Sequence, residues 1–445
     1  MNTLINPHSP SRKRITDWRK TCYVSEFLTK TEKEACLMGW LQELQKNKTT
    51  DFGKPSLKMV FRDSTGTMTF QIKNQTIIQQ LSKLEKESVI ALKVQNGSIR
   101  DLKILAEAKQ PPVLPGKITE YSSLDLVIHR PYALRSEKMT SILKIQDRIF
   151  AAARNFFEKR KFYELRPPII GPATDPGIRG ANTGEFDFYG KKYKLTTSMI
   201  LYKQMAICSL EKIYSFAPNV RLEEPEAKTT GRHLAEFCQI DVEQAFIDYY
   251  DAMNLGEELV IAIISDVINH CQKELTILER KLSIPTKPFE KITHLEAIKC
   301  LQSLGIKDLQ FGQEIPWEAE KRLSEEYDQP FWIIDYPNGS RGFYDRKNPK
   351  KPDYLKDFDL MYPEGYGEAI SGSEREFQYE FVKRKMIKQG LNLEEYHWYL
   401  EMLQRGVPPS AGFGLGVERL TRYICGLEKI WEATAFPKVP GIYSP

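Results

Sequence analysis

The sequence lacks the features that mark membrane-spanning, secreted and zinc-binding proteins. No apolar run approaches the roughly 18 residues that a membrane-spanning helix needs, and the polar N-terminal stretch has no apolar core like that of a signal peptide. The seven cysteines are scattered, and none forms a Cys-x-x-Cys pair. This spacing argues against a disulfide framework and against a zinc site. The sequence therefore predicts a cytoplasmic protein with reduced thiols.

The chain also lacks a strong excess of charge of one sign. Its 445 residues include 64 Lys and Arg against 59 Asp and Glu, which gives a net charge of +5. An excess of this size permits nucleic-acid binding but does not argue for it, because many ordinary enzymes carry one. The hydrophobic content of 41% is enough for a large core and for more than one domain.

Changes of pattern along the chain predict two domains. Short alternating strands around the turn Ser64-Thr65-Gly66, together with one helix, indicate a small five-stranded barrel of the OB type. A stretch rich in Pro and Gly follows and marks a boundary. The predicted segments are an N-terminal extension (1–30), the OB-type barrel (31–109), a linker (110–120) and a larger domain (121–445).

The stretch 215–246 combines two strand-like runs with charged residues where they meet. Side chains two apart on a strand share a face, so Arg221 and Glu223 are expected to point the same way. The chain returns through Arg232 and His233 into the second run. Arginine forks suit phosphate oxygens, and a carboxylate can accept from an exocyclic amine, so the pattern indicates a polyphosphate site. The alternative is a solvated hairpin with surface ion pairs, which is the commoner meaning of such charges.

A second stretch, 411–420 (AGFGLGVERL), has three glycines in five residues before a Glu-Arg pair and a helical pattern. Glycine lets a backbone or a nucleotide approach closely, and an arginine at a helix start suits an anion. With the first stretch it resembles motifs 2 and 3 of the class II aminoacyl-tRNA synthetases, in the aspartate, asparagine and lysine branch. The sequences that carry the resemblance are RHLAEF beside an Arg-x-Glu strand, and GxGxER leading into a helix.

The resemblance implies an α+β fold, in which the barrel precedes a class II core of antiparallel sheet flanked by helices. It also implies an enzyme that joins an amino acid to the α-phosphate of ATP with Mg²⁺, by positioning and charge neutralisation. Carboxylates at Asp359 and Glu368 are the implied metal ligands, and Arg221 and Arg419 the implied catalytic residues. The implied ATP-binding residues are Arg221, Glu223, Arg232, His233, Phe237, Glu368, Gly416 and Arg419.

The segment 196–204 (TTSMILYKQ) resembles QSPQLYKQ of the aspartate enzymes, whose lysine contacts the side-chain carboxylate of the substrate. Lys203 has that place, and an ammonium gains more from a carboxylate than from a neutral amide. The expected substrate is therefore aspartate, with asparagine as the alternative. Thr197, Met199 and Ile200 depart from the aspartate pattern. The resemblance places Asp175, Ser198, Lys203, Ser371 and Arg375 at the amino acid.

The final acceptor of the adenylate stays open between two alternatives. The barrel favours transfer to the 3′ end of tRNA. The other alternative is a tRNA-independent amide synthetase, similar to the asparagine synthetases, in which ammonia or another amine attacks aspartyl-adenylate. Lys58 and Thr69 favour it, because they stand where the family carries a base-stacking aromatic and an anticodon-reading Gln. So do a motif 2 loop a few residues longer than usual and a missing C-terminal arginine.

A long amphipathic helix is expected at about residues 141–161, before a strand that opens near Pro168. This succession resembles motif 1 of the class II enzymes, which forms their dimer interface. The resemblance therefore implies a homodimer, although the sequence alone would also fit a simple core helix.

Overall fold

The computed structural model describes residues 18–29, 34–47, 56–176 and 182–445. The chain divides into two compact units, Met1–Ser122 and Ser123–Pro445. The boundary lies two residues beyond the predicted linker. No helix of the described residues is both long and apolar enough to cross a membrane.

The smaller unit is an antiparallel, OB-like sheet in the order β3-β2-β1-β4-β5. The predicted hairpin is confirmed, since β2 ends at Asp63 and β3 begins at Gly66. Lys58 on β2 faces Gln45 and Gln71 in the register, and Thr69 on β3 is exposed. The elements are α1 (Val24–Thr29), β1 (Glu34–Asn47), β2 (Ser56–Asp63), β3 (Gly66–Ile72), α2 (Gln75–Leu81), β4 (Val89–Gln95) and β5 (Ser98–Ala106).

The larger unit is built on an eight-stranded sheet in the order β12-β13-β14-β15-β16-β11-β10-β6. Its inner pairs are antiparallel, and only the pairs at the two edges are parallel. The predicted α+β class with an antiparallel class II sheet is confirmed. The strands are β6 (Tyr163–Glu164), β10 (Lys212–Val220), β11 (Glu236–Ala245), β12 (Glu290–Thr293), β13 (Phe331–Ile334), β14 (Asp357–Tyr362), β15 (Gly367–Glu374) and β16 (Ser410–Gly416).

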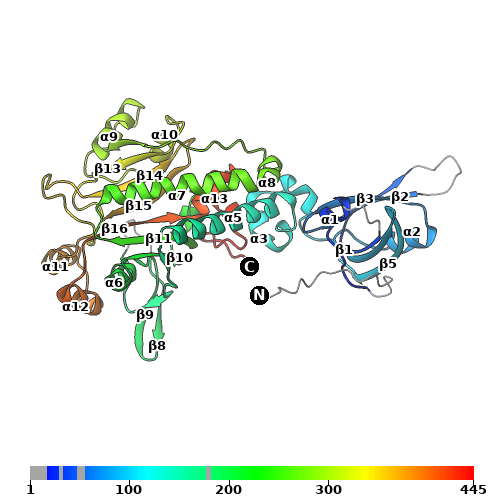
Figure 1. Cartoon of the computed structure of the whole chain (residues 1–445), viewed down its shortest axis with the longest axis horizontal. Coiled ribbons are helices and arrows are strands. Elements are labelled where there is room, and N and C mark those ends of the chain that lie inside the picture. The colour runs from blue at the N-terminus through cyan, green and yellow to red at the C-terminus, as the bar shows by residue number, and fades with distance from the viewer. Residues whose placement is uncertain (1–17, 30–33, 48–55, 177–181) are drawn as a thin grey trace, which may run out of the picture. The chain divides into compact units, whose positions relative to one another are not determined.

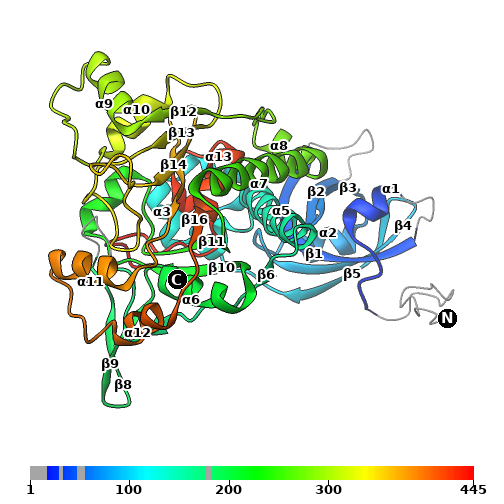
Figure 2. The ribbon, with the colours of Figure 1, turned by 60° about the vertical axis from the view of Figure 1, so that its left-hand side comes forward.

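Three helices cover one face of this sheet: α5 (Glu137–Lys159), α7 (Tyr249–His270) and α13 (Val417–Cys425). Figure 1 and Figure 2 show α5 and α7 side by side along the sheet. The predicted long helix begins four residues earlier than expected, because the Ser136 hydroxyl accepts a hydrogen bond from the Met139 backbone and caps its first turn. Aliphatic and aromatic side chains of the helices and strands share one core, in which Trp332 and Phe413 are fully buried.

Smaller groups of elements complete the unit. Helices α6 (Ile200–Leu210), α11 (Tyr379–Lys388) and α12 (His397–Arg405) share a second apolar core with Phe343. The short β7 (Ile170–Gly171) pairs with the hairpin β8 (Glu185–Phe188) and β9 (Lys191–Leu195), which projects from the unit in Figure 2. The remaining helices are η1 (Pro115–Glu120), α3 (Ser123–Ile128), α4 (Arg130–Ala133), η2 (Pro225–Thr230), α8 (Gln272–Ile277), α9 (His294–Ser303), α10 (Trp317–Ser324) and η3 (Ile430–Ala433).

Candidate active site

The loop between β10 and β11 carries the first charged cluster. Strand β10 ends at Val220, so the expectation that Arg221 and Glu223 lie on a strand is wrong. The Arg221 backbone N–H donates to the carbonyl of Ala235 at 2.8 Å, and the chain then leaves the sheet for the helix η2. Gly231 ends this helix with a φ of 66°, a left-handed conformation that glycine adopts without strain.

Arg221 and Phe237 meet across the base of this loop. The Arg221 guanidinium lies 5.1 Å from the centre of the Phe237 ring, and its Nε donates to the Thr197 carbonyl at 3.2 Å. A cation over an aromatic face is attracted by the quadrupole of the ring. Two residues that the resemblance places at ATP, Arg221 at the α-phosphate and Phe237 under adenine, are thus neighbours here.

A second group of predicted phosphate-binding residues gathers around Glu368 on β15. Arg419, in the first turn of α13 after Gly416, lies 2.8 Å from the Glu368 carboxylate, measured from Nη1 to Oε1. Arg232 lies 3.5 Å from the same carboxylate and also pairs with Glu320 of α10. Glu320 was not predicted, since it comes 88 residues after Arg232 in a helix without any motif.

The two carboxylates predicted to hold a metal each face an arginine. Asp359 on β14 forms an ion pair with Arg341, whose Nη1 also donates to the Ser371 hydroxyl at 3.5 Å, while Glu368 faces Arg419. Among the described residues, no group of three or more His, Cys, Asp or Glu side chains could hold a metal ion. As arranged, the two carboxylates do not fit a common Mg²⁺ site, and their assignment as ligands stays a prediction.

A cavity of about 120 Å³ lies beside these arginines. All five residues that the resemblance places at the amino acid line it, and so does Arg221. These residues come from four separated segments and line one cavity, but their roles stay predictions, and sequence reasoning did not find the whole lining. The polar residues of the lining that it missed are Gln239, Asp241, Arg341, Tyr344, Asp345 and Asp357.

Lys203 is held by protein groups on every side. Its ammonium donates to Asp241 Oδ1 at 2.8 Å and to the carbonyls of Phe413 at 3.1 Å and Val242 at 3.3 Å. An ammonium has three donors, so these contacts use all of them. The other carboxylate oxygen of Asp241, Oδ2, is buried without a hydrogen-bond partner among the residues that the structure describes. Lys203 thus neutralises Asp241 and leaves one acceptor of that carboxylate unused.

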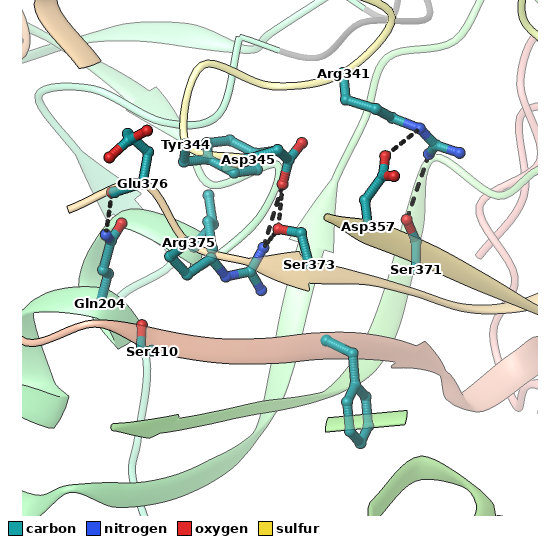
Figure 3. A network of polar contacts seen from close by, with 12 residues as sticks. Gln204, Arg341, Tyr344, Asp345, Asp357, Ser371, Ser373, Arg375, Glu376 and Ser410 are labelled. Atoms are coloured by element: carbon teal, nitrogen blue, oxygen red, sulfur yellow. Dashed lines mark hydrogen bonds and ion pairs between the residues drawn. The ribbon is translucent and has the colours of Figure 1, made fainter. Parts of the chain in front are cut away.

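Arg375, directly after the end of β15, also lines the cavity (Figure 3). Its Nε donates to Glu243 Oε1 at 3.1 Å, and its Nη2 donates to Glu243 Oε2 at 3.2 Å. Its Nη1 donates to the Ser373 hydroxyl at 2.7 Å. Buried Glu243 raises the pKa of Arg375 against the opposing effect of its burial, which lowers it, and the guanidinium stays charged.

Asp175, another residue of the cavity lining, accepts a hydrogen bond from the Tyr344 hydroxyl at 3.0 Å. Burial raises the pKa of Tyr344 well above its usual value, and the nearby carboxylates of Asp175 and Asp345 add to this effect. The phenol therefore stays protonated and keeps donating to Asp175. The carboxylate is thereby fixed as an acceptor at the edge of the cavity.

Known proteins resemble this chain over nearly its whole length. Residues 126–440 match the family model described as tRNA synthetases class II (D, K and N). An asparagine–tRNA ligase of Pyrococcus furiosus is 32% identical over 442 residues, covering 95% of this chain and 99% of the relative. The asparagine–tRNA ligase of Pelotomaculum thermopropionicum is 31% identical over 427 residues, covering 91% of this chain and 95% of the relative.

A solved structure agrees with both findings. Asparaginyl-tRNA synthetase of Pyrococcus horikoshii, complexed with asparaginyl-adenylate, superposes with a TM-score of 0.86 and 29% identity, covering 96% of this chain and 100% of that one. Fold and sequence thus agree, and the chain belongs to the class II tRNA synthetases of the D, K and N family, which makes it an ATP-dependent aminoacyl-tRNA ligase.

Proposed function

We propose that the chain activates asparagine with ATP and transfers it to the 3′ end of tRNA. The observation that carries the choice of amino acid is the buried Oδ2 of Asp241 on the wall of the cavity, which has no hydrogen-bond partner within the part of the chain that the structure describes. The two ligases named above are asparagine enzymes, and the solved Pyrococcus horikoshii synthetase is a complex with asparaginyl-adenylate. The expectation of aspartate from Lys203 gains no support from them.

An asparagine side chain has the groups that this cavity requires. Its amide NH₂ would donate to Asp241 Oδ2, and its carbonyl would accept a single N–H of Arg375. An aspartate carboxylate would instead meet the Asp241 carboxylate at close range in a buried site, where like charges repel strongly. Lys203 could not offset this repulsion without leaving its own three acceptors.

The first half of the reaction, formation of the adenylate, uses the predicted phosphate-binding residues. An oxygen of the asparagine α-carboxylate attacks the α-phosphorus of ATP, and the bond to pyrophosphate breaks. Arg221 is the cation nearest to both reactants, since it lines the cavity and contacts Phe237, on which adenine would stack. Arg419, with Arg232 and His233, would neutralise the departing pyrophosphate, and Glu223 would accept from the adenine amine.

Mg²⁺ enters this proposal only as the counter-ion of the ATP phosphates. The arginines beside Asp359 and Glu368 leave no shared cation site between these two carboxylates, so no step above depends on a metal that the protein holds.

In the second half, a hydroxyl of the 3′-terminal ribose of tRNA attacks the carbonyl carbon of the adenylate, and AMP leaves. The OB-like unit supports a tRNA acceptor, because barrels of this type bind oligonucleotides. The amide-synthetase alternative gains no support from the relatives named above, both of which are tRNA ligases. Lys58 and Thr69 would then lie on a barrel that contacts tRNA without the usual aromatic platform.

A homodimer and a cytoplasmic location belong to the same proposal. The seven cysteines are scattered along the sequence without a Cys-x-x-Cys pair, a pattern that suits a reducing compartment. Ile169, in the motif 1 segment between β6 and β7, is 53% exposed, which suits a residue that a second copy would cover. Light scattering after size-exclusion chromatography gives the mass directly, and a monomeric mass would contradict the dimer.

The experiment that tests the proposed function is ATP–pyrophosphate exchange with asparagine and with aspartate, followed by acceptor assays. We expect exchange with asparagine, together with acylation of an asparagine tRNA transcript. Exchange with aspartate alone would contradict the choice of amino acid. Release of free asparagine from aspartate and ammonium, without charged tRNA, would support the amide synthetase instead.

A further inference from the structure

The guanidinium of Arg375 is occupied on both of its edges. Glu243 accepts from Nε and Nη2 along one edge. At the other edge, Nη1 donates to the Ser373 hydroxyl at 2.7 Å and lies 3.5 Å from Asp345 Oδ1 (Figure 3). Arg375 has five N–H groups, and these contacts use at least one N–H on each edge, so that single N–H groups remain but neither edge keeps two donors for a second carboxylate.

An open edge decides what an arginine can bind. A carboxylate binds arginine best through two parallel N–H···O bonds along one edge, and this bidentate geometry gives the pair most of its strength and specificity. A carbonyl oxygen needs only one N–H. With both edges occupied, Arg375 can still serve an amide carbonyl but cannot hold a second carboxylate beside Glu243 in a bidentate pair.

Asp345 controls the second edge in two ways. It accepts a short hydrogen bond from the Ser373 hydroxyl, which turns the free lone pairs of that oxygen toward Arg375. Its own carboxylate also stands next to Nη1, where a substrate carboxylate would otherwise bind. Asp345 is 6% exposed and lines the cavity, so this charge is not screened by bulk water.

The surroundings hold Asp345 in place. The Lys385 ammonium donates to the backbone carbonyl of Asp345, and the Asp345 backbone N–H donates to the carbonyl of Gly342 at 3.2 Å. These contacts fix the main chain of the segment while the carboxylate remains directed at Ser373 and Arg375 (Figure 3). The Asp345 carboxylate therefore stands beside Nη1 of Arg375 in the structure without substrate.

We infer that Asp345 is a specificity-determining residue, which closes the Nη1 edge of Arg375 and so favours asparagine over aspartate. The inference rests on the proposed function, because it explains the selection of an amide by this same cavity. It also accounts for a lysine and an arginine in a pocket that nevertheless takes a neutral side chain. Without substrate, Lys203 is already paired with Asp241, and Arg375 with Glu243.

The test compares kcat/KM for asparagine and for aspartate in pyrophosphate exchange for the full-length wild type, Asp345→Asn and Ser373→Ala. Asp345→Asn removes the charge at nearly constant shape, and Ser373→Ala removes the bridge while keeping the charge. We expect the ratio of asparagine to aspartate to fall by roughly tenfold in Asp345→Asn, mainly through a lower KM for aspartate, which is the effect of one interaction worth about 1.4 kcal/mol. Ser373→Ala should shift the ratio in the same direction.

The matched control is Asp353→Asn, which removes one negative charge at an exposed position of the loop before β14. Its ratio should equal that of the wild type. If the wild type prefers asparagine and both pocket variants keep its ratio of kcat/KM values, the role of Asp345 is overturned and the proposed function stands. A wild type that prefers aspartate, or that activates neither amino acid, overturns the proposed function and with it this inference. Because the ratio is measured within each protein, partial misfolding cannot imitate the shift, and Ser373→Ala decides if Asp345→Asn does not fold.

Discussion

Lys203 and Asp241 form a buried ion pair, with 2.8 Å between Nζ and Oδ1 and both side chains at most 3% exposed. Glu243 adds a second carboxylate 3.7 Å from the same ammonium. Lys203 therefore contributes to the stability of the protein interior in addition to lining the cavity.

Lys203→Met should lower the free energy of unfolding of the larger unit by about 3–5 kcal/mol, because it leaves the buried carboxylate of Asp241 without its cation, while Glu243 keeps its pair with Arg375. A lysine that served only the substrate would leave stability nearly unchanged and would raise KM alone. Thermal unfolding followed by circular dichroism separates the two outcomes. Lys192→Met is the control, since the Lys192 side chain is 87% exposed and its loss should cost little.

Asp241→Asn should impair asparagine activation more than aspartate activation. The substitution removes the charged acceptor that we assign to the substrate amide, and a hydrogen bond to a charged group is worth about 1.5–3 kcal/mol. We therefore expect kcat/KM for asparagine in pyrophosphate exchange to fall by roughly 10-fold to 100-fold. An equal loss with both amino acids would show that Asp241 only supports Lys203.

Arg221→Ala and Arg419→Ala should each abolish adenylate formation, since each removes a cation from the phosphate-binding cluster. Pyrophosphate exchange with saturating asparagine measures this directly. Arg405→Ala is the control, because the Arg405 side chain is 71% exposed and pairs only with the neighbouring Glu401 among the described residues. Near-normal exchange in either active-site variant would refute the assignment of that arginine.

Sequence reasoning found the cavity because its residues lie next to recognisable local patterns. Lys203 lies within the LYKQ pattern, Arg375 follows Gly372 and Ser373 near the end of β15, and Arg419 follows the glycines of β16. These patterns depend on backbone geometry at the ends of sheet strands, which a short stretch of sequence specifies. The helix boundary at Ser136 was missed by a few residues, since a single capping hydroxyl set it.

What the sequence could not give is which charges pair. Lys203 was assigned to a substrate carboxylate, but the fold brings it to Asp241, 38 residues away, and to the carbonyl of Phe413, 210 residues away. No pattern in the sequence singled out Asp345 or Asp357, yet both are buried in the cavity wall. Pairings of this kind follow from the order of strands in the sheet, which no local pattern encodes.

Asp357 gives the stability of the protein a dependence on pH. Its Oδ1 accepts from the Tyr336 backbone at 2.9 Å, while its Oδ2 is buried without a hydrogen-bond partner among the described residues. Burial raises the pKa of Asp357 to about 8, although Arg341 opposes the shift. The folded protein therefore binds this proton more tightly than the unfolded chain does, so the contribution of Asp357 to stability is complete below the unfolded pKa near 4 and is lost as the pH rises toward 8.

Asp357→Asn removes this titration and keeps the acceptor for Tyr336. The free energy of unfolding of the wild type should fall relative to that of the variant between pH 4 and pH 8, by at most about 1.4 kcal/mol per pH unit, the limit for one proton. Denaturant unfolding of both proteins at several pH values in this range measures the difference. Curves that run parallel across the range would mean that Asp357 is ionised in the folded protein and that Arg341, 3.8 Å away, fully offsets its burial.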